Sequence, residues 1–175
     1  MKPTTTIFIG APLSGDEAHV LQALCRDLEG TGALILANFN TPKRQIDFVV
    51  INPSYAALLE LKNFPRLIFG EQNGIWTYEN FAGNRIRHAG ENPWQQTKDA
   101  KFALSDEMSK YQKRMADIPL PAGKGYFTQI AAFVCIYPAI HPQSQVTSGD
   151  HKVAVRSYKE IEPPGTSVES VDDRY

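Results

Sequence analysis

The sequence predicts an α/β fold in which a mixed central β-sheet is flanked by helices. The predicted elements run in the order helix, strands, helix and buried strand, which is typical of layered α/β domains. The run 128–137 is almost entirely apolar, as expected for a strand that is buried on both faces. With 175 residues, 42% of them apolar and 21% charged, the chain has the size and composition of one globular domain.

Two helices are expected from their capping signals. Ser14 and Glu17 have the spacing of a capping box, so the first helix is expected to start at Ser14 and to run to about Leu28. Asn92 as the N-cap and Pro93 at the first helical position open the second helix. One face of the second helix is expected to carry Gln96, Ala100, Leu104, Met108 and Tyr111.

Short extended runs predict strands at 5–9, 33–39, 45–51, 56–62, 66–69, 75–79, 128–137 and 152–158. The runs 45–51 and 56–62 flank a short Asn-Pro-Ser-Tyr break, which is typical of a β-hairpin. Residues 1–158 are expected to form a single domain. The segment 159–175 is rich in proline, serine and acidic residues, so a flexible tail or a linker is expected there.

The predicted hairpin places charged side chains on apolar strands. If Pro53 and Ser54 form the loop, Asp47 faces Glu60, and Lys62 points to the same face as Glu60. Two carboxylates about 5 Å apart at Cβ repel each other, and a divalent cation between them would remove the conflict. The structural alternative is an Asp47–Lys62 ion pair, which would leave Glu60 without a partner.

These residues resemble a known nuclease signature. Asp47, a hairpin and then Glu60-Leu61-Lys62 resemble the core of the PD-(D/E)XK nuclease superfamily, with Ile46 where a proline is usual. Glu60-Leu-Lys-Asn63 and the later Glu91-Asn-Pro-Trp-Gln-Gln96 are together similar to the NERD domain, a nuclease-related branch of that superfamily. The similarity runs from about 16 to about 101 and continues more weakly through 128–137. It implies a restriction-endonuclease-like core.

The resemblance implies a nuclease that hydrolyses DNA phosphodiester bonds with Mg²⁺ or Mn²⁺. Asp47, Glu60 and the backbone carbonyl of Leu61 are the expected metal ligands. Lys62 is expected to orient the attacking water and to stabilise the charge that develops on the phosphoryl oxygens.

Two further site residues follow from the resemblance. Glu17 matches an acidic residue near the start of the first helix, where it could hold a second metal or orient a metal-bound water. The capping box explains Glu17 equally well. Gln96 is expected to face the site and to contact the scissile phosphate or a metal-bound water, although Gln95 competes for this role.

Charge and cysteine content bear on partners and location. A net charge of −1 and a pI of about 6.4 exclude a strong overall basic field, but a local basic groove stays compatible with them. Lys101, Arg85 and Arg87 are candidates for contacts to the DNA backbone, with solvated surface charges as the alternative. Cys25 and Cys135 are interpreted as buried thiols in a reducing compartment. Neither a signal-peptide pattern nor a long apolar run is present, so a cytoplasmic protein is expected.

Two other functions remain open. The chain could keep a nuclease fold with little activity and serve as a nucleic-acid-binding accessory module, with a partner protein or a further domain. The near-neutral charge and the final segment favour that hypothesis. A nucleotide-handling α/β enzyme is the third hypothesis, because 10–15 is similar to a phosphate loop, but it lacks the Gly-Lys-Ser/Thr that holds a triphosphate.

Overall fold

The structure is a computed structural model that describes residues 3–52, 55–114 and 130–161. Its larger sheet has six strands in the order β1-β2-β3-β4-β8-β10. They are β1 (Thr6–Ile9), β2 (Leu34–Asn40), β3 (Gln45–Asn52), β4 (Tyr55–Asn63), β8 (Ile130–Tyr137) and β10 (Ala154–Ser157). β3 is antiparallel to both of its neighbours, and the other neighbouring pairs are parallel. The predicted mixed central sheet is confirmed.

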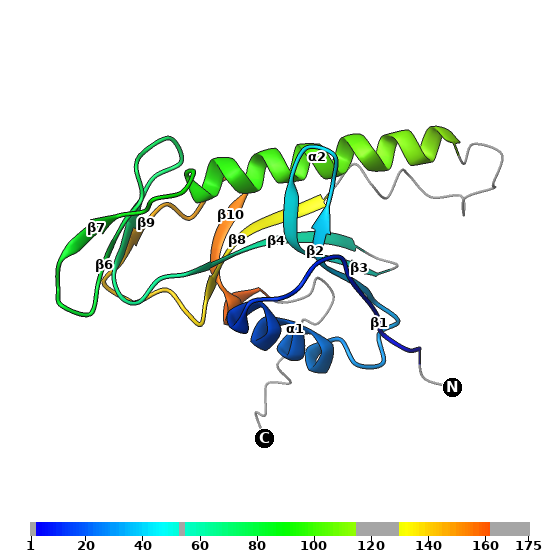
Figure 1. The fold of residues 1–175 in the computed structure, drawn as a ribbon, viewed down its shortest axis with the longest axis horizontal. Helices are drawn as coiled ribbons and strands as arrows, with labels where there is room; N and C mark the ends of the chain where they lie inside the picture. Colours follow the sequence, from blue (N-terminus) through cyan, green and yellow to red (C-terminus); the bar gives the residue numbers. More distant parts are fainter. Residues whose placement is uncertain (1–2, 53–54, 115–129, 162–175) are drawn as a thin grey trace, which may run out of the picture.

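Two helices cover opposite faces of this sheet, α1 (Gly15–Asp27) on one side and α2 (Pro93–Arg114) on the other (Figure 1). Val20, Leu21 and Leu24 of α1 are buried in the core on the first face. Ala100 and Leu104 of α2 are buried in the core on the second face. Two separate cores form because successive side chains of a strand point to opposite faces.

Both helices begin where the sequence predicted. Ser14 and Glu17 form the capping box at α1. At α2, Asn92 Oδ1 accepts hydrogen bonds from the backbone N–H groups of Trp94, at 2.8 Å, and Gln95, at 3.2 Å. Tyr111 departs from the predicted inner face of α2 and is 57% exposed, because the last turns of this helix extend beyond the sheet (Figure 1).

A smaller sheet lies beside the start of α2, with strand order β7-β6-β5-β9 (Figure 1). Its strands are β5 (Ile68–Gly70), β6 (Thr77–Glu79), β7 (Arg85–Arg87) and β9 (Gln145–Val146). The strands predicted at 66–69 and 75–79 form here but start two residues later. β7 was predicted only as a polar, extended stretch and β9 was not predicted, because runs this short carry no periodicity.

The last strands agree with the prediction, with β10 at the sheet edge. Residues 128–129 of the predicted strand, and 162–175 of the predicted tail, lie outside the described residues. Tyr158–Glu160 form a short 3-10 helix, and Ile161 packs against the α1-side core. Cys25 and Cys135 are both free thiols, the first half-buried and the second buried. Over the described ranges, no helix is long and apolar enough to cross a membrane.

Candidate active site

The β3–β4 hairpin has the register that the sequence predicted. Asn52 pairs with Tyr55, and the ladder continues to Phe48 and Leu59. It stops one residue short of Asp47 and Glu60, so these two residues flank the point where the strands separate.

The Asp47 carboxylate takes the place of the missing ladder at this point. Its Oδ2 accepts a hydrogen bond of 2.7 Å from the backbone N–H of Leu61. In a strand, the N–H and C=O of one residue point toward the same neighbouring strand. The Leu61 carbonyl is therefore directed to the side of the sheet on which Asp47 lies.

Glu60 is buried, with 1% of its surface exposed. Its Oε1 accepts hydrogen bonds from Lys62 Nζ, at 2.8 Å, and from Gln96 Nε2. Its Oε2 is buried and has no hydrogen-bond partner. Lys62 thus pairs with Glu60 and not with Asp47, which differs from the purely structural alternative. A buried carboxylate oxygen without a partner is costly, so its presence calls for an explanation such as an ion.

The environment of Asp47 opposes its ionisation. Burial and, after it, the neighbouring charge of Glu60 raise its pKa to about 7, against the lowering effects of Lys62 and the Leu61 N–H. The two carboxylates therefore interact, as the predicted pairing requires. A divalent cation would favour the ionised form of both.

The available oxygen donors fit a small hard cation. Among the described residues, no group of three or more His, Cys, Asp and Glu side chains is placed to hold a metal. The donors are two carboxylates, from Asp47 and Glu60, and the carbonyl of Leu61. Mg²⁺ commonly binds through one or two carboxylates and keeps several waters, so this donor set suits it.

Glu17 lies near these residues but makes its own contacts. Its Oε2 accepts hydrogen bonds from the backbone N–H of Ser14, at 2.5 Å, and from Asn38 Nδ2, at 3.2 Å. Its charge is one of the influences that raise the pKa of Asp47, so the two carboxylates are in electrostatic reach of each other. The capping role is present, and both of these hydrogen bonds are accepted by Oε2.

The two glutamines at the start of α2 are directed to different places. Gln96 donates a hydrogen bond to Glu60, while its expected contact with a phosphate or a metal-bound water stays a prediction. Gln95 donates to Asn73 Oδ1, at 2.8 Å, and to Gln72 O, at 3.3 Å, on the loop between β5 and β6.

The predicted DNA-contacting residues are not gathered in one place. Lys101 Nζ donates to the backbone carbonyl of Lys152, at 2.9 Å. The Arg85 guanidinium lies 4.0 Å from the centre of the Phe69 ring, and its Nε donates to Thr77 Oγ1, at 2.8 Å. Both cations are therefore engaged within the domain.

Arg87 has a different setting from Arg85. Together with His88 it lines a hollow of about 280 Å³ between β7 and the start of α2. Burial and the charge of Lys62 both lower the pKa of His88, so the hollow lies close to Lys62.

Two residues at the site were missed from the sequence. Asn38 of β2 is 2% exposed and has a positive φ of 47°. An asparagine within a strand pattern was the available signal, because asparagine is rare in strands and tolerates the left-handed region.

Arg44 pairs with Glu91, at 2.8 Å, and with Asp99, at 3.7 Å, and so joins the β2–β3 turn to the start of α2. Only its tertiary surroundings distinguish it from other arginines.

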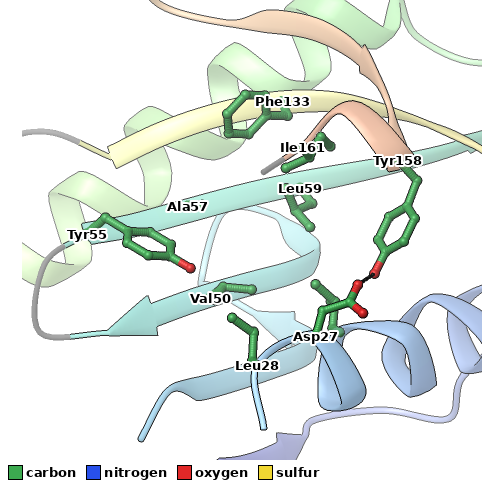
Figure 2. Close-up of a pocket in the computed structure, with 10 residues that line it drawn as sticks. Asp27, Leu28, Val50, Tyr55, Ala57, Leu59, Phe133, Tyr158 and Ile161 are labelled. Atoms are coloured by element: carbon green, nitrogen blue, oxygen red, sulfur yellow. Dashed lines mark hydrogen bonds between the residues drawn. The ribbon is translucent and has the colours of Figure 1, made fainter. Parts of the chain in front are cut away.

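A separate apolar cavity of about 50 Å³ lies between α1 and the sheet (Figure 2). Aliphatic and aromatic side chains such as Leu59 and Phe133 surround it, and Tyr158 donates a hydrogen bond of 3.2 Å to Asp27 at its edge (Figure 2). This face is opposite the one from which Gln96 reaches Glu60. The cavity is therefore not part of the carboxylate site.

Comparison with models of known protein families finds a match. The family model of NERD, the nuclease-related domain, matches residues 14–136. No curated protein matches the chain, and no solved structure does. The matched span includes Glu17, both hairpin acids, Lys62 and Gln96.

Proposed function

The chain belongs to the nuclease-related domain family, and on this premise we propose that it is a divalent-metal-dependent nuclease that hydrolyses DNA phosphodiester bonds. Asp47, Glu60 and the Leu61 carbonyl hold Mg²⁺ or Mn²⁺ in this proposal. Lys62 and Gln96 act beside them.

One observation carries the proposal. Glu60 is almost fully buried, one of its carboxylate oxygens has two donors, and the other has none. A residue kept only for stability would have both oxygens satisfied or would be apolar. A half-satisfied buried acid next to Asp47 is the arrangement expected of a metal ligand.

The side chains have separate roles. When bound, the cation lowers the pKa of water to produce a nucleophile and shields the charge of the phosphoryl oxygens. Gln96 fixes the orientation of Glu60 by donating to Oε1. The Lys62 side chain is 15% exposed, and its ammonium has donors beyond the one used by Glu60, so it can contact a substrate phosphate. Hydrolysis adds water across one P–O ester bond, which gives a phosphate monoester and a hydroxyl.

The substrate path is proposed to pass the hollow beside His88. Arg87 is exposed there, and in the described part of the chain it makes no ion pair or hydrogen bond through its guanidinium. It is therefore the better of the two β7 arginines for a DNA phosphate. Arg85, already packed on Phe69, is the natural control.

Plasmid cleavage with MgCl₂ or MnCl₂ tests the proposed reaction. Asp47→Asn and Lys62→Ala are expected to lower the cleavage rate by at least about 100-fold, because each removes an interaction with the reacting centre. Asp106→Asn and Lys110→Ala change similar residues on the far part of α2, in surface ion pairs, and should cleave like the wild type. Cleavage that persists in both site variants would rule out this mechanism.

The accessory-module hypothesis gives a different result. The net charge of −1 is the observation that favours it. In that case the wild type binds DNA without cutting it, and calorimetry with MnCl₂ shows no heat of binding. Heat of binding that is lost in Glu60→Gln supports the metal site independently of cleavage.

A further inference from the structure

Asn38 interrupts a strand at the level of Asp47. Its φ of 47° is the only positive value among the non-glycine residues of the described chain. In the β2–β3 ladder, Ala37 pairs with Phe48 and Phe39 pairs with Ile46, but Asn38 and Asp47 between them are not paired.

The side-chain pattern of both strands changes at this point. In a regular strand, residues two apart share a face. Phe48 packs in the α1-side core, whereas Ile46 packs in the α2-side core. On β2, Leu36 and Phe39 are three residues apart and both contact the α2-side core. The left-handed backbone of Asn38 therefore accompanies a local twist that sets Asp47 apart from the regular sheet.

The Asn38 side chain uses all of its hydrogen-bonding groups to connect three segments. Nδ2 donates to the carbonyl of Pro12, at 2.7 Å, and to Glu17 Oε2, at 3.2 Å. Oδ1 accepts from Gln45 Nε2, at 3.0 Å. Gln45 lies two residues before Asp47. One buried amide thus links the helix that carries Glu17 to the strand that carries Asp47.

Gly10 leaves room for this conformation. A Cβ atom at Gly10 would lie 2.6 Å from the backbone oxygen of Asn38, which is closer than real Cβ atoms approach. Gly10 also donates its N–H to Ala37, at 2.9 Å. Any side chain at Gly10 would therefore push on the backbone of Asn38.

We propose that Asn38 is a positioning residue of the nuclease site. Its backbone separates β2 from β3 at Asp47, and its amide holds the Glu17 carboxylate toward Asp47. Strained non-glycine backbone persists where the surrounding structure fixes it, and it is concentrated at functional sites. This inference rests on the proposed function, and in it Asn38 acts on the site through Glu17.

Asn38→Gly tests the side-chain amide separately from the backbone conformation. Glycine adopts a positive φ without strain, so the fold is retained while all three side-chain hydrogen bonds are lost. We expect Mn²⁺ affinity, measured by calorimetry, and the cleavage rate each to fall by about 10-fold or more, as when a residue that orients a ligand is removed. Asn80→Gly, in the turn of the smaller sheet, is the matched control and should change neither.

A double-mutant cycle tests whether Asn38 acts through Glu17. Glu17→Gln alone is expected to weaken Mn²⁺ binding, and Asn38→Gly is expected to add little in the Glu17→Gln background. Additive losses would contradict this route. Gly10→Ala keeps every side chain of the site and should reproduce the Asn38→Gly effect by displacing the Asn38 backbone.

The possible results separate this inference from the proposed function. Wild-type affinity and cleavage in Asn38→Gly, with circular dichroism showing a folded protein, overturns the role of Asn38 alone. A wild type that does not cut DNA but loses Mn²⁺ affinity on Asn38→Gly supports the positioning role and overturns the nuclease activity. A wild type that neither cuts DNA nor binds Mn²⁺ overturns both.

Discussion

The two carboxylate oxygens of Glu60 have unlike surroundings. Oε1 accepts from Lys62 and Gln96, while Oε2 has no donor. Asp47 adds a second acid nearby, and its raised pKa reflects burial first and Glu60 second. In the absence of a cation, this arrangement costs stability that a purely structural core would not lose.

Two substitutions at this pair should have unequal effects on stability without metal. In EDTA, Lys62→Met is expected to lower the free energy of unfolding by about 3 kcal/mol, because it leaves a buried charge without its cationic partner. Glu60→Gln should change it by less than about 1 kcal/mol, since the amide removes both the unpaired oxygen charge and the repulsion with Asp47, and the Lys62 side chain, which is 15% exposed, still reaches water. Urea unfolding followed by fluorescence measures both values.

Addition of MnCl₂ provides the control for this pair. It should raise the unfolding free energy of the wild type, by about 2.7 kcal/mol at a concentration 100 times the dissociation constant, and should leave Glu60→Gln unchanged. Equal losses for both substitutions in EDTA would argue against an acid held in place for a metal.

At the scale of elements, the start of α2 organises the smaller sheet. Asn92 caps the helix through Oδ1, and its Nδ2 donates to the carbonyls of Glu71, Gln72 and Gly74. The same helical turn carries Gln96, which contacts Glu60. One capped helix start therefore fixes both the β5–β6 loop and a site residue.

Substitutions of Asn92 should distinguish these two roles. Asn92→Ala is expected to destabilise the protein by about 1–2 kcal/mol, because the cap is lost. Asn92→Asp keeps the cap acceptor but removes the amide donor, so the loop should loosen while helix stability is largely kept. Hydrogen exchange of the 71–75 amides, compared with those of α2, measures the two effects. Equal protection of the loop in Asn92→Asp and wild type would show that the donor bonds contribute little.

At the scale of the whole molecule, the last described segment packs on the α1 face. Tyr158 donates to Asp27 across 131 positions of sequence, beside the apolar cavity (Figure 2). Burial, followed by the charge of Asp27 and the hydrogen bond, raises the pKa of Tyr158 above its ordinary value. The folded state therefore keeps this proton to a higher pH than the unfolded state does.

This contact predicts that the free energy of unfolding depends on pH in the alkaline range. The contribution of Tyr158 is fully present below its unfolded pKa of about 10 and is lost as the pH rises above it. Tyr158→Phe should lower the unfolding free energy by about 0.5–1 kcal/mol at pH 8. It should also make the unfolding free energy fall less steeply as the pH rises above about 10. Asp27→Asn keeps the hydroxyl and should give an intermediate slope. Urea unfolding between pH 8 and 11 tests this, and identical slopes for all three proteins would refute it.

The sequence by itself determined the local features. The capping signals located the start of both helices, and the break at Pro53 and Ser54 set the hairpin register, because these features depend on near neighbours. The acids on either side of that hairpin could be identified for the same reason. The short strands β7 and β9 of the smaller sheet could not be identified from the sequence. They are stabilised by pairing with other segments, and their own residues carry no clear strand pattern.

Only the tertiary structure decided how these residues meet. It paired Lys62 with Glu60, selected Gln96 over Gln95, and placed Asn38 between Glu17 and the strand of Asp47. It also gave Arg87 and Arg85 different surroundings, although both are arginines and lie two positions apart in the sequence. Burial and hydrogen-bond partners depend on how helices pack across a sheet, and segments far apart in the chain bring these groups together.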